Sequence, residues 1–309
     1  MTGAASELAP LLHAIADDAP RFYGQGRVNS SIPRLAAVDP HQFGIAVATL
    51  DGDVATAGSA RVPFSIQSIS KVFSLCMALD HFGEGLWEHV GRNPSGQRFN
   101  SLVRVELEHG RPMNPFINPG ALVVADCLVQ RLAAPVHAYL GYLRKFAKTQ
   151  RVAIDEKVAR SELKTAFRNY SAANLLKDYG NLAGDPTAVV NAYTHFCAAT
   201  MTCVELARAA LPLANDGHDL ATGRSLLPPG RSRRINALML TCGLYDAAGD
   251  FAYRVGLPAK SGVGGAIVAV VPNRMTIAVW SPELDELGNS VAGFAALERL
   301  AREADLSVF

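Results

Sequence analysis

The chain has 309 residues and a mass of 32.9 kDa, a length typical of about two domains around a large core. Hydrophobic residues make up 49% of the sequence and charged residues 18%, a composition that excludes intrinsic disorder. The formal net charge of +1 gives no basis for a nucleic-acid partner, and no apolar run is long enough to predict a membrane span.

Targeting and redox signals are weak. The first residues lack a basic stretch followed by an apolar one, so we expect no signal peptide and a cytoplasmic protein. The histidines show no metal-ligand spacing and no nucleotide-binding loop is present, so we expect neither a metal nor a cofactor. The cysteines form no Cys-x-x-Cys pair and are expected to be free thiols: Cys76, Cys127, Cys197, Cys203 and Cys242.

Strand patterns occupy both ends of the chain. Residues 43–50 form an apolar run followed by Asp51-Gly52, which predicts a buried strand entering a tight hairpin. Near the other end, apolar runs at 266–271 and 275–280 flank a second hairpin turn, and an amphipathic stretch at 289–303 predicts a closing helix.

Helical spacing dominates between about residues 70 and 225, with almost no strand pattern. The clearest helical stretches are 71–82, 120–133, 155–168, 186–199 and 204–213. We therefore expect an α/β (α+β) protein. An antiparallel sheet with flanking helices would be built from residues 1–70 and 226–309, with an inserted helical domain over 71–225. The active site is expected at the junction.

Ser68 and Lys71 form a Ser-x-x-Lys motif directly before an apolar helical run. Positions three apart share a helix face, so a neutral Lys71 could take the proton of Ser68 as its hydroxyl attacks a carbonyl. The motif alone is weak, because Ser161 and Lys164 have the same spacing. Its simpler interpretation is a helix-terminal serine and a solvated lysine.

A second motif, Lys260-Ser261-Gly262, matches the Lys-[Ser/Thr]-Gly pattern that accompanies Ser-x-x-Lys in penicillin-recognising enzymes. It precedes the strand at 266–271, where an edge strand could border a pocket. Backbone N–H groups of Ser68 and Val263 could form an oxyanion hole. Because a free lysine is protonated at pH 7, Lys71 would need burial or a second cation, for which Lys260 is the candidate.

Together with further motifs, these residues resemble the serine-dependent glutaminase family over roughly residues 22–303. The matching segments, in family order, are 64–73, 94–96, 99–101 (Phe99-Asn100-Ser101), 114–121, 161–163, 168–169, Tyr193, 242–246, 260–265 and 281–290.

The resemblance implies a β-lactamase/transpeptidase-like fold, hydrolysis of L-glutamine to L-glutamate and ammonia without a cofactor, and a homo-oligomer, commonly a homotetramer. Carried over by position, Ser68 is the nucleophile, Lys71 its general base, and Tyr245 a relay of the proton to the departing ammonia. The backbone at Ser68 and Val263 receives the oxyanion. The residues implied to hold the amino-acid end are Asn118, Glu162, Asn169 and Tyr193.

The residue types suit that task. Glu162 can accept hydrogen bonds from the substrate ammonium, and Asn118 and Asn169 can donate to its carboxylate. The seven-residue spacing of Glu162 and Asn169 suggests that one helix face presents both. If each of these residues is considered alone, the simpler interpretation is a solvated, capping or packing residue.

The sequence departs from the family at Ser31, where many members have a tyrosine that lines the pocket, and also at Asn93 and Pro119. Two alternative functions therefore stay open. One is a β-lactamase, peptidase or esterase that uses the same serine, although no Ser-Asp-Asn motif lies between the two lysine motifs. The other is a glutamine sensor without turnover.

Overall fold

The computed structural model describes residues 4–96, 100–228 and 230–309. Its largest sheet has five strands in the order β2-β1-β8-β7-β6, and each neighbouring pair is antiparallel. The strands are β1 (Gly44–Thr49), β2 (Val54–Gly58), β6 (Ala259–Gly262), β7 (Ala266–Val271) and β8 (Met275–Trp280). The predicted antiparallel sheet and the strands at 43–50, 266–271 and 275–280 are confirmed, and β6 lies at an edge.

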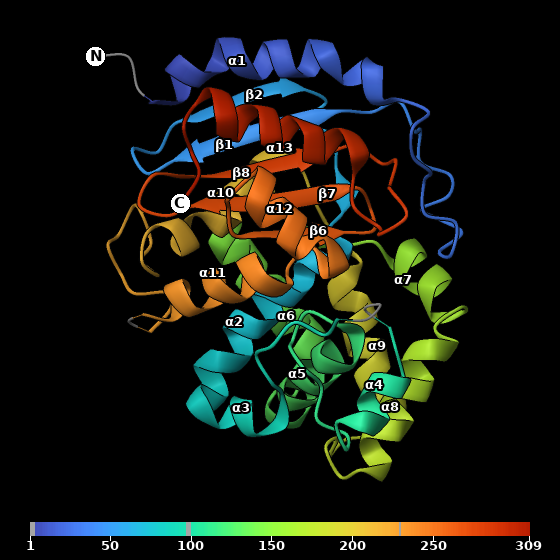
Figure 1. Ribbon diagram of the computed structural model, residues 1–309. Coiled ribbons are helices and arrows are strands. Elements are labelled where there is room, and N and C mark those ends of the chain that lie inside the picture. The colour runs from blue at the N-terminus through green and yellow to red at the C-terminus, as the bar shows by residue number, and fades with distance from the viewer. Residues whose placement is uncertain (1–3, 97–99, 229) are drawn as a thin grey trace.

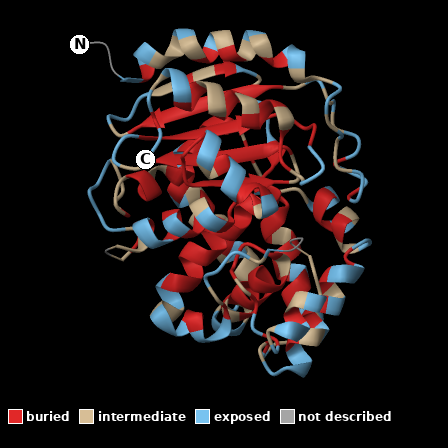
Figure 2. Cartoon of the chain, viewed as in Figure 1, coloured by how far each residue is buried: buried red, intermediate tan, exposed pale blue. Residues whose placement is uncertain are grey.

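Both faces of this sheet are buried, and helices cover each of them (Figures 1 and 2). Alternate residues of a strand point to opposite faces. In β1, Ile45 and Val47 join one apolar cluster, whereas Ala46 and Ala48 join another. Helices α1 (Ala4–Asp18), α12 (Ala248–Arg254) and α13 (Val291–Glu303) contribute to the first cluster, and α10 (Cys203–Ala214) packs on the opposite face. Helix α13 confirms the predicted closing helix, whereas sequence periodicity did not identify α1.

The part of the chain between β3 and the end of α10 is mainly helical, as predicted. Four of the expected stretches match α2 (Ser70–Phe82), α5 (Asn118–Arg131), α9 (Pro186–Cys197) and α10. The division at residues 70/71 and 225/226 stays a prediction. The other described helices are α3 (Leu86–His89), α4 (Val103–Leu107), α6 (Pro135–Ala147), α7 (Glu156–Leu163), α8 (Phe167–Asp178) and α11 (Arg231–Cys242), with short 3₁₀ turns η1 (Ala19–Phe22), η2 (Gln67–Ile69), η3 (Gly83–Gly85) and η4 (Tyr245–Ala247).

Two features of this region differ from the sequence-based expectation. The stretch 155–168 is two helices, because α7 ends at Leu163 and α8 begins at Phe167. In the break, the hydroxyl of Thr165 donates to the carbonyl oxygens of Ser31 and Glu162 at 3.1 and 3.2 Å, which holds the chain in a bend. A small sheet, β3-β5-β4, is also present: β3 (Phe64–Ser65), β4 (Ala153–Ile154) and β5 (Ala199–Met201) are too short to show a strand period.

Among the described residues, no single helix has the length and apolar character needed to cross a membrane. Helices α5 and α6, which are bent by 105° relative to each other, are long and apolar enough only when the two are counted as one segment.

A glycine contact fixes the position of the segment that follows α11. Gly243 packs so closely on β6 that a Cβ atom there would overlap the carbonyl oxygen of Ala259. Its own carbonyl accepts a hydrogen bond from the N–H of Ser261 at 3.3 Å. Tyr245 follows two residues later with a φ of +56°, so this contact sets where Tyr245 meets the sheet edge.

We predict that Gly243→Ala lowers the free energy of unfolding by more than about 2 kcal/mol, because the backbone of β6 cannot yield to the added methyl group. Gly141→Ala is the matched control. Gly141 is an exposed residue of α6 with open space around its Cβ position, so the same change should stabilise the protein by up to about 1 kcal/mol. Urea unfolding of both variants at one protein concentration tests this, and equal effects would contradict it.

Candidate active site

Ser68 lies in a tight turn between β3 and α2. It belongs to η2, which runs into the first turn of α2, where Lys71 is found. The preceding residue, Gln67, has a φ of +48°, a strained conformation for a residue with a side chain and one that concentrates at functional sites. Ser68 is 6% exposed and Lys71 is 1% exposed. The predicted Ser-x-x-Lys pair is therefore buried, which excludes the simpler interpretation of a solvated lysine.

The ammonium group of Lys71 has two defined partners. Its Nζ donates to the carbonyl oxygen of Phe116 at 3.1 Å and to Oδ1 of Asn118 at 2.7 Å. Burial disfavours the charged form and lowers the pKa of Lys71 from 10.5 to about 8, although the nearby Cys197 and Glu162 oppose the shift. At neutral pH an appreciable fraction of this lysine is neutral and able to accept a proton.

Glycines bring β6 against the Ser68 turn. A Cβ atom on Gly262 would lie 2.6 Å from the carbonyl oxygen of Ile66 and 3.4 Å from the backbone nitrogen of Ser68. A Cβ atom on Gly264 would lie 2.6 Å from the carbonyl oxygen of Ser65. The two distances of 2.6 Å are too short for a Cβ atom, so glycine is needed at both positions. Val263 is carried between them, next to the backbone of the nucleophile turn.

Buried Lys260 and half-buried Tyr245 form a second pair beside Ser68. The Nζ atom of Lys260 lies 4.2 Å from the centre of the Tyr245 ring and donates to the carbonyl oxygen of Ser261 at 2.6 Å. Burial, followed by the charge of Lys71, lowers the pKa of Lys260 well below its usual value. Burial is the main cause of the lowered pKa of both lysines, and the like charge of Lys71 adds to the shift of Lys260. Burial raises the pKa of Tyr245, and a hydrogen bond with the Ser68 side chain partly opposes this rise.

A cavity of about 190 Å³ opens beside Ser68, and we call it the amino-acid cavity. The residues that line it include Asn118, Asn169 and Tyr193, which are linked by hydrogen bonds. Nδ2 of Asn118 donates to Oδ1 of Asn169 at 3.0 Å, and the Tyr193 hydroxyl donates to Oδ1 of Asn118 at 3.3 Å. The cavity thus brings together six residues identified from the sequence: Ser68, Asn118, Glu162, Asn169, Tyr193 and Val263.

Glu162 supplies a buried carboxylate to this cavity. Burial raises its pKa to about 7, opposed by a hydrogen bond with Gln67 and by the charge of Lys71. Its Oε2 atom has no hydrogen-bond partner among the described residues. The expectation that one helix face presents both Glu162 and Asn169 is wrong, because Glu162 lies in the last turn of α7 and Asn169 in the first turn of α8. The bend between these helices, rather than a shared face, directs both residues into the cavity.

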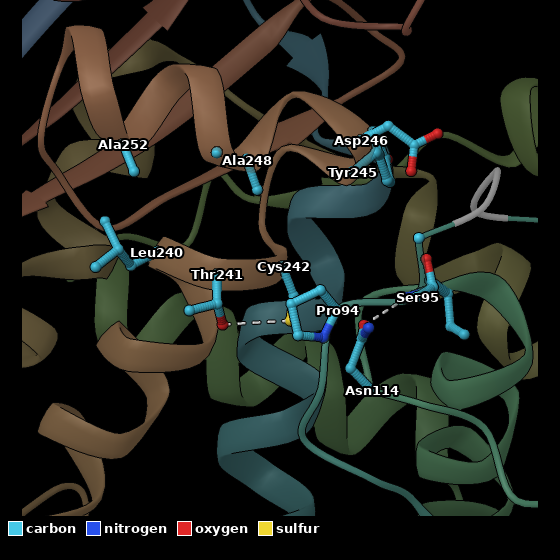
Figure 3. Close-up of a pocket in the computed structure, with 13 residues that line it drawn as sticks. Pro94, Ser95, Asn114, Leu240, Thr241, Cys242, Tyr245, Asp246, Ala248 and Ala252 are labelled. Carbon is cyan, nitrogen blue, oxygen red and sulfur yellow. Dashed lines mark hydrogen bonds between the residues drawn. The ribbon is translucent and has the colours of Figure 1, made fainter.

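A second cavity, of about 560 Å³, has Tyr245 and Ile117 among its lining residues, and we call it the outer cavity. Figure 3 shows the side chains that line it, among them Tyr245, Cys242 and Asn114. Tyr245 is the only residue identified from the sequence as part of the site that lines this cavity, and it does not line the amino-acid cavity.

Sequence reasoning did not assign roles to several residues that line the amino-acid cavity. Gln67 lines the cavity and is 2% exposed. It lies inside segment 64–73, which resembles the family, so the sequence could have indicated it as a site residue. Arg168 is exposed, and its Nε donates to the carbonyl oxygen of Asn100 at 2.8 Å. Ser31 also lines the cavity at the departure noted above, and its hydroxyl donates to Asn29. Phe99 of the matching segment 99–101 lies outside the described residues.

The fold and this centre define an α/β protein of the β-lactamase-like type. A family model described as Glutaminase matches residues 26–309. The chain is 52% identical to a glutaminase of Yersinia pestis over 300 residues, with 97% of each chain covered. It is also 52% identical to a glutaminase of Rhizobium rhizogenes over 307 residues, with 98% of this chain and 99% of the relative covered. The chain belongs to the glutaminase family.

Solved structures of similar proteins agree with this assignment. A structure of a probable glutaminase of Bacillus subtilis has a TM-score of 0.89 at 34% identity and covers 98% of both chains. A structure of Mglu in its glutamate form has a TM-score of 0.92 at 36% identity and covers 99% of this chain and 70% of that one.

The pKa of Lys71 can be tested through stability. A cation whose pKa falls on folding destabilises the folded protein below that pKa, and the penalty fades as pH rises toward the unfolded value. We predict that wild type gains about 2 kcal/mol relative to Lys71→Met between pH 7 and pH 10. Urea unfolding of both proteins at the two pH values measures this gain. A stability difference that does not change with pH would show that the pKa is not lowered.

Proposed function

We propose that this protein hydrolyses the side-chain amide of L-glutamine to L-glutamate and ammonia through an acyl-enzyme on Ser68, with Lys71 as the general base. The observation that carries the proposal is the buried carboxylate of Glu162, which lines a small cavity together with Ser68 and whose Oε2 has no hydrogen-bond partner among the described residues. In its ionised form such a carboxylate is stabilised by a cationic ligand, because an unpaired buried charge is costly. The relatives named above support glutamine as that ligand.

The charges around the amino-acid cavity suit a zwitterion. Glu162 and Arg168 are the charged side chains that line it in the described part of the chain, one buried and one exposed. The substrate ammonium would bind Glu162, which is then held in its ionised form. The carboxylate would take the amide N–H groups of Asn118 and Asn169, with Tyr193 beside them, in place of the bond that now joins the two asparagines.

In the acylation step, neutral Lys71 takes the proton of the Ser68 hydroxyl as its oxygen attacks the side-chain carbonyl carbon. The backbone N–H groups of Ser68 and Val263 stabilise the oxyanion, each donor contributing roughly 3 kcal/mol to the lowering of the barrier. The proton passes by way of Tyr245 to the amide nitrogen, and the C–N bond breaks to release ammonia. Water then attacks the ester in a reversal of these proton transfers, which frees L-glutamate and restores Ser68.

Two further properties belong to the proposal. A homo-oligomer, in particular a homotetramer, follows from the family resemblance. A cytoplasmic location is supported by the free cysteines, of which four are buried. Size-exclusion chromatography with light scattering tests the first, and fractionation of the native host tests the second.

The reaction and its nucleophile can be tested together. We predict that wild type releases ammonia from L-glutamine and not from D-glutamine, and that Ser68→Ala abolishes release while still binding L-glutamate in calorimetry. Ser74→Ala is the matched control, since Ser74 is a buried serine of α2, the helix that follows η2, and does not line the cavity. Ammonia release by Ser68→Ala would exclude this nucleophile. Glutamine binding without release by wild type would instead indicate a sensor.

The pH dependence follows from two ionisations. The value of kcat/KM should rise as Lys71 loses its proton through a pKa of about 8, and more steeply below pH 7, where Glu162, with its pKa of about 7, is also protonated. Glu162→Gln removes a charge that raises the pKa of Lys71. We therefore predict a lower kcat/KM, a single ionisation on the acid side, and a midpoint shifted to lower pH.

The control for this experiment is Glu156→Gln, the same change at an exposed residue of α7. It should leave the profile unchanged. If Glu162→Gln kept the wild-type midpoint and slope, Glu162 would not be the ammonium ligand.

A further inference from the structure

Asn114 is a buried polar residue that has no role in the mechanism above. It is 2% exposed and begins segment 114–118, which also supplies the two acceptors of Lys71. It lines the outer cavity (Figure 3), and its side chain makes three hydrogen bonds within the protein. A buried amide with several partners holds the backbone around it in one arrangement, so the identity of those partners indicates what it positions.

The two ends of the Asn114 amide have different partners. Its Nδ2 atom donates to the carbonyl oxygen of Asn93 at 2.8 Å, which anchors the side chain. Its Oδ1 atom accepts from the backbone N–H groups of Phe116 at 3.0 Å and of Ile117 at 3.2 Å. The anchor uses only the backbone of residue 93, so the departure from the family at Asn93 does not remove it.

The hydrogen bond from Ile117 fixes the direction of the Phe116 carbonyl group. A peptide bond is planar, and in its trans form the N–H and C=O groups point in opposite directions. The peptide between Phe116 and Ile117 is trans. Its N–H group donates to Asn114, and its carbonyl oxygen accepts from Nζ of Lys71 at 3.1 Å. Asn114 and Lys71 therefore bind the same rigid unit from opposite sides.

We propose that Asn114 is a positioning residue for the general base, because it holds the peptide whose carbonyl group binds Lys71. The catalytic part of this inference rests on the proposed function. Hydrogen bonds in a chain polarise one another, so the bond at the N–H group also makes the carbonyl oxygen a stronger acceptor. A stronger acceptor favours the ammonium form of Lys71. Asn114 thus influences both the position of the amine and its pKa.

Titratable groups from several elements surround the start of α2, and none of them is changed in the experiments below. They are Tyr139 of α6, Glu162 of α7, Tyr193 and Cys197 of α9, Tyr245 of η4 and Lys260 of β6. Of these, Cys197 and Glu162 raise the pKa of Lys71 against the effect of burial. Because these groups are the same in every variant, a change in the pKa of Lys71 reports the change at the carbonyl acceptor.

The first experiment removes the acceptor with Asn114→Ala. We expect kcat for L-glutamine to fall by at least about tenfold, while KM changes less than about threefold. The midpoint of kcat/KM that belongs to Lys71 should move down from about 8 by about half a pH unit or more, because an acceptor of the ammonium is weakened. A midpoint that stays or rises would overturn the inference, and so would an unchanged kcat.

Asn114→Asp is the conservative variant, and it keeps the proposal falsifiable if Asn114→Ala fails to fold. It retains an oxygen that accepts from the two N–H groups, so the peptide keeps its direction. We expect kcat on the plateau of the pH profile to stay within about threefold of wild type, with a midpoint at or above the wild-type value. A fall in kcat of tenfold or more, with a lowered midpoint, would contradict the positioning role.

Asn236→Ala is the matched control. Asn236 is a buried residue of α11 whose Nδ2 donates to the carbonyl oxygen of Leu213 at 2.9 Å, and it lines neither cavity. Its loss should lower the free energy of unfolding, leave kcat within about twofold and leave the midpoint unchanged. Equal midpoint shifts in Asn236→Ala and Asn114→Ala would show a general effect of destabilisation and overturn the inference.

The same hydrogen bond can also be removed from the side of the peptide. Ile117 has a φ of −80°, which proline can adopt, and Ile117→Pro deletes the N–H group that donates to Asn114. We expect the midpoint to move down as in Asn114→Ala, and the double variant to shift no further than the larger single shift. Additive shifts would show that the two residues act separately, which would contradict the inference.

A stability measurement separates this inference from the proposed function. In the Asn114→Ala background, the stability gained between pH 7 and pH 10 relative to Lys71→Met should exceed the gain in the wild-type background, because the pKa of Lys71 falls further on folding. Urea unfolding gives this value without any activity. Failure of wild type to release ammonia would overturn the proposed function, whereas equal gains in the two backgrounds would overturn the present inference.

Discussion

The burial of the Lys71 amine is the constraint on which the rest of the site depends. A lysine in water is almost fully protonated at neutral pH, so it can serve as a base only where solvent is excluded. That exclusion requires apolar packing around the start of α2, while two oxygen acceptors, from Phe116 and Asn118, must satisfy the amine. The same Asn118 then reaches Asn169 and Tyr193, so the group that holds the base also organises the amino-acid cavity.

This arrangement is assembled from segments far apart in the sequence, and close backbone contact makes that possible. Gly262 and Gly264 let β6 approach the Ser68 turn, and Gly243 lets the Tyr245 segment approach β6. Backbone strain is also present at this place, since Gln67 and Tyr245 are two of the seven described non-glycine residues with positive φ values. Strained residues persist only when the surrounding structure holds them in place, and here packing against β6 supports both turns.

The sequence predicted the elements with a strong period and the motifs with a chemical signature. The hairpin at 266–280 was recognised because its two strands are buried throughout and are therefore continuously apolar. Helices α2, α5, α9 and α10 were recognised because their apolar residues recur at helical spacing. Helix α1 was not recognised, and it has Pro10 in its interior, a residue that argues against a helix. Strands β4 and β5 have two and three residues and are too short to show a period. The bend between α7 and α8 depends on Thr165 meeting Ser31, a contact between distant residues that no local pattern contains.

The site shows the same division between local and long-range information. The residues of the amino-acid cavity could be named from a family resemblance, but the split between the two cavities could not. That split exists because segment 114–118 directs Phe116 and Asn118 to Lys71 and leaves Asn114 and Ile117 facing outward. One short segment thus contributes both the acceptors that hold Lys71 and part of the wall of the outer cavity.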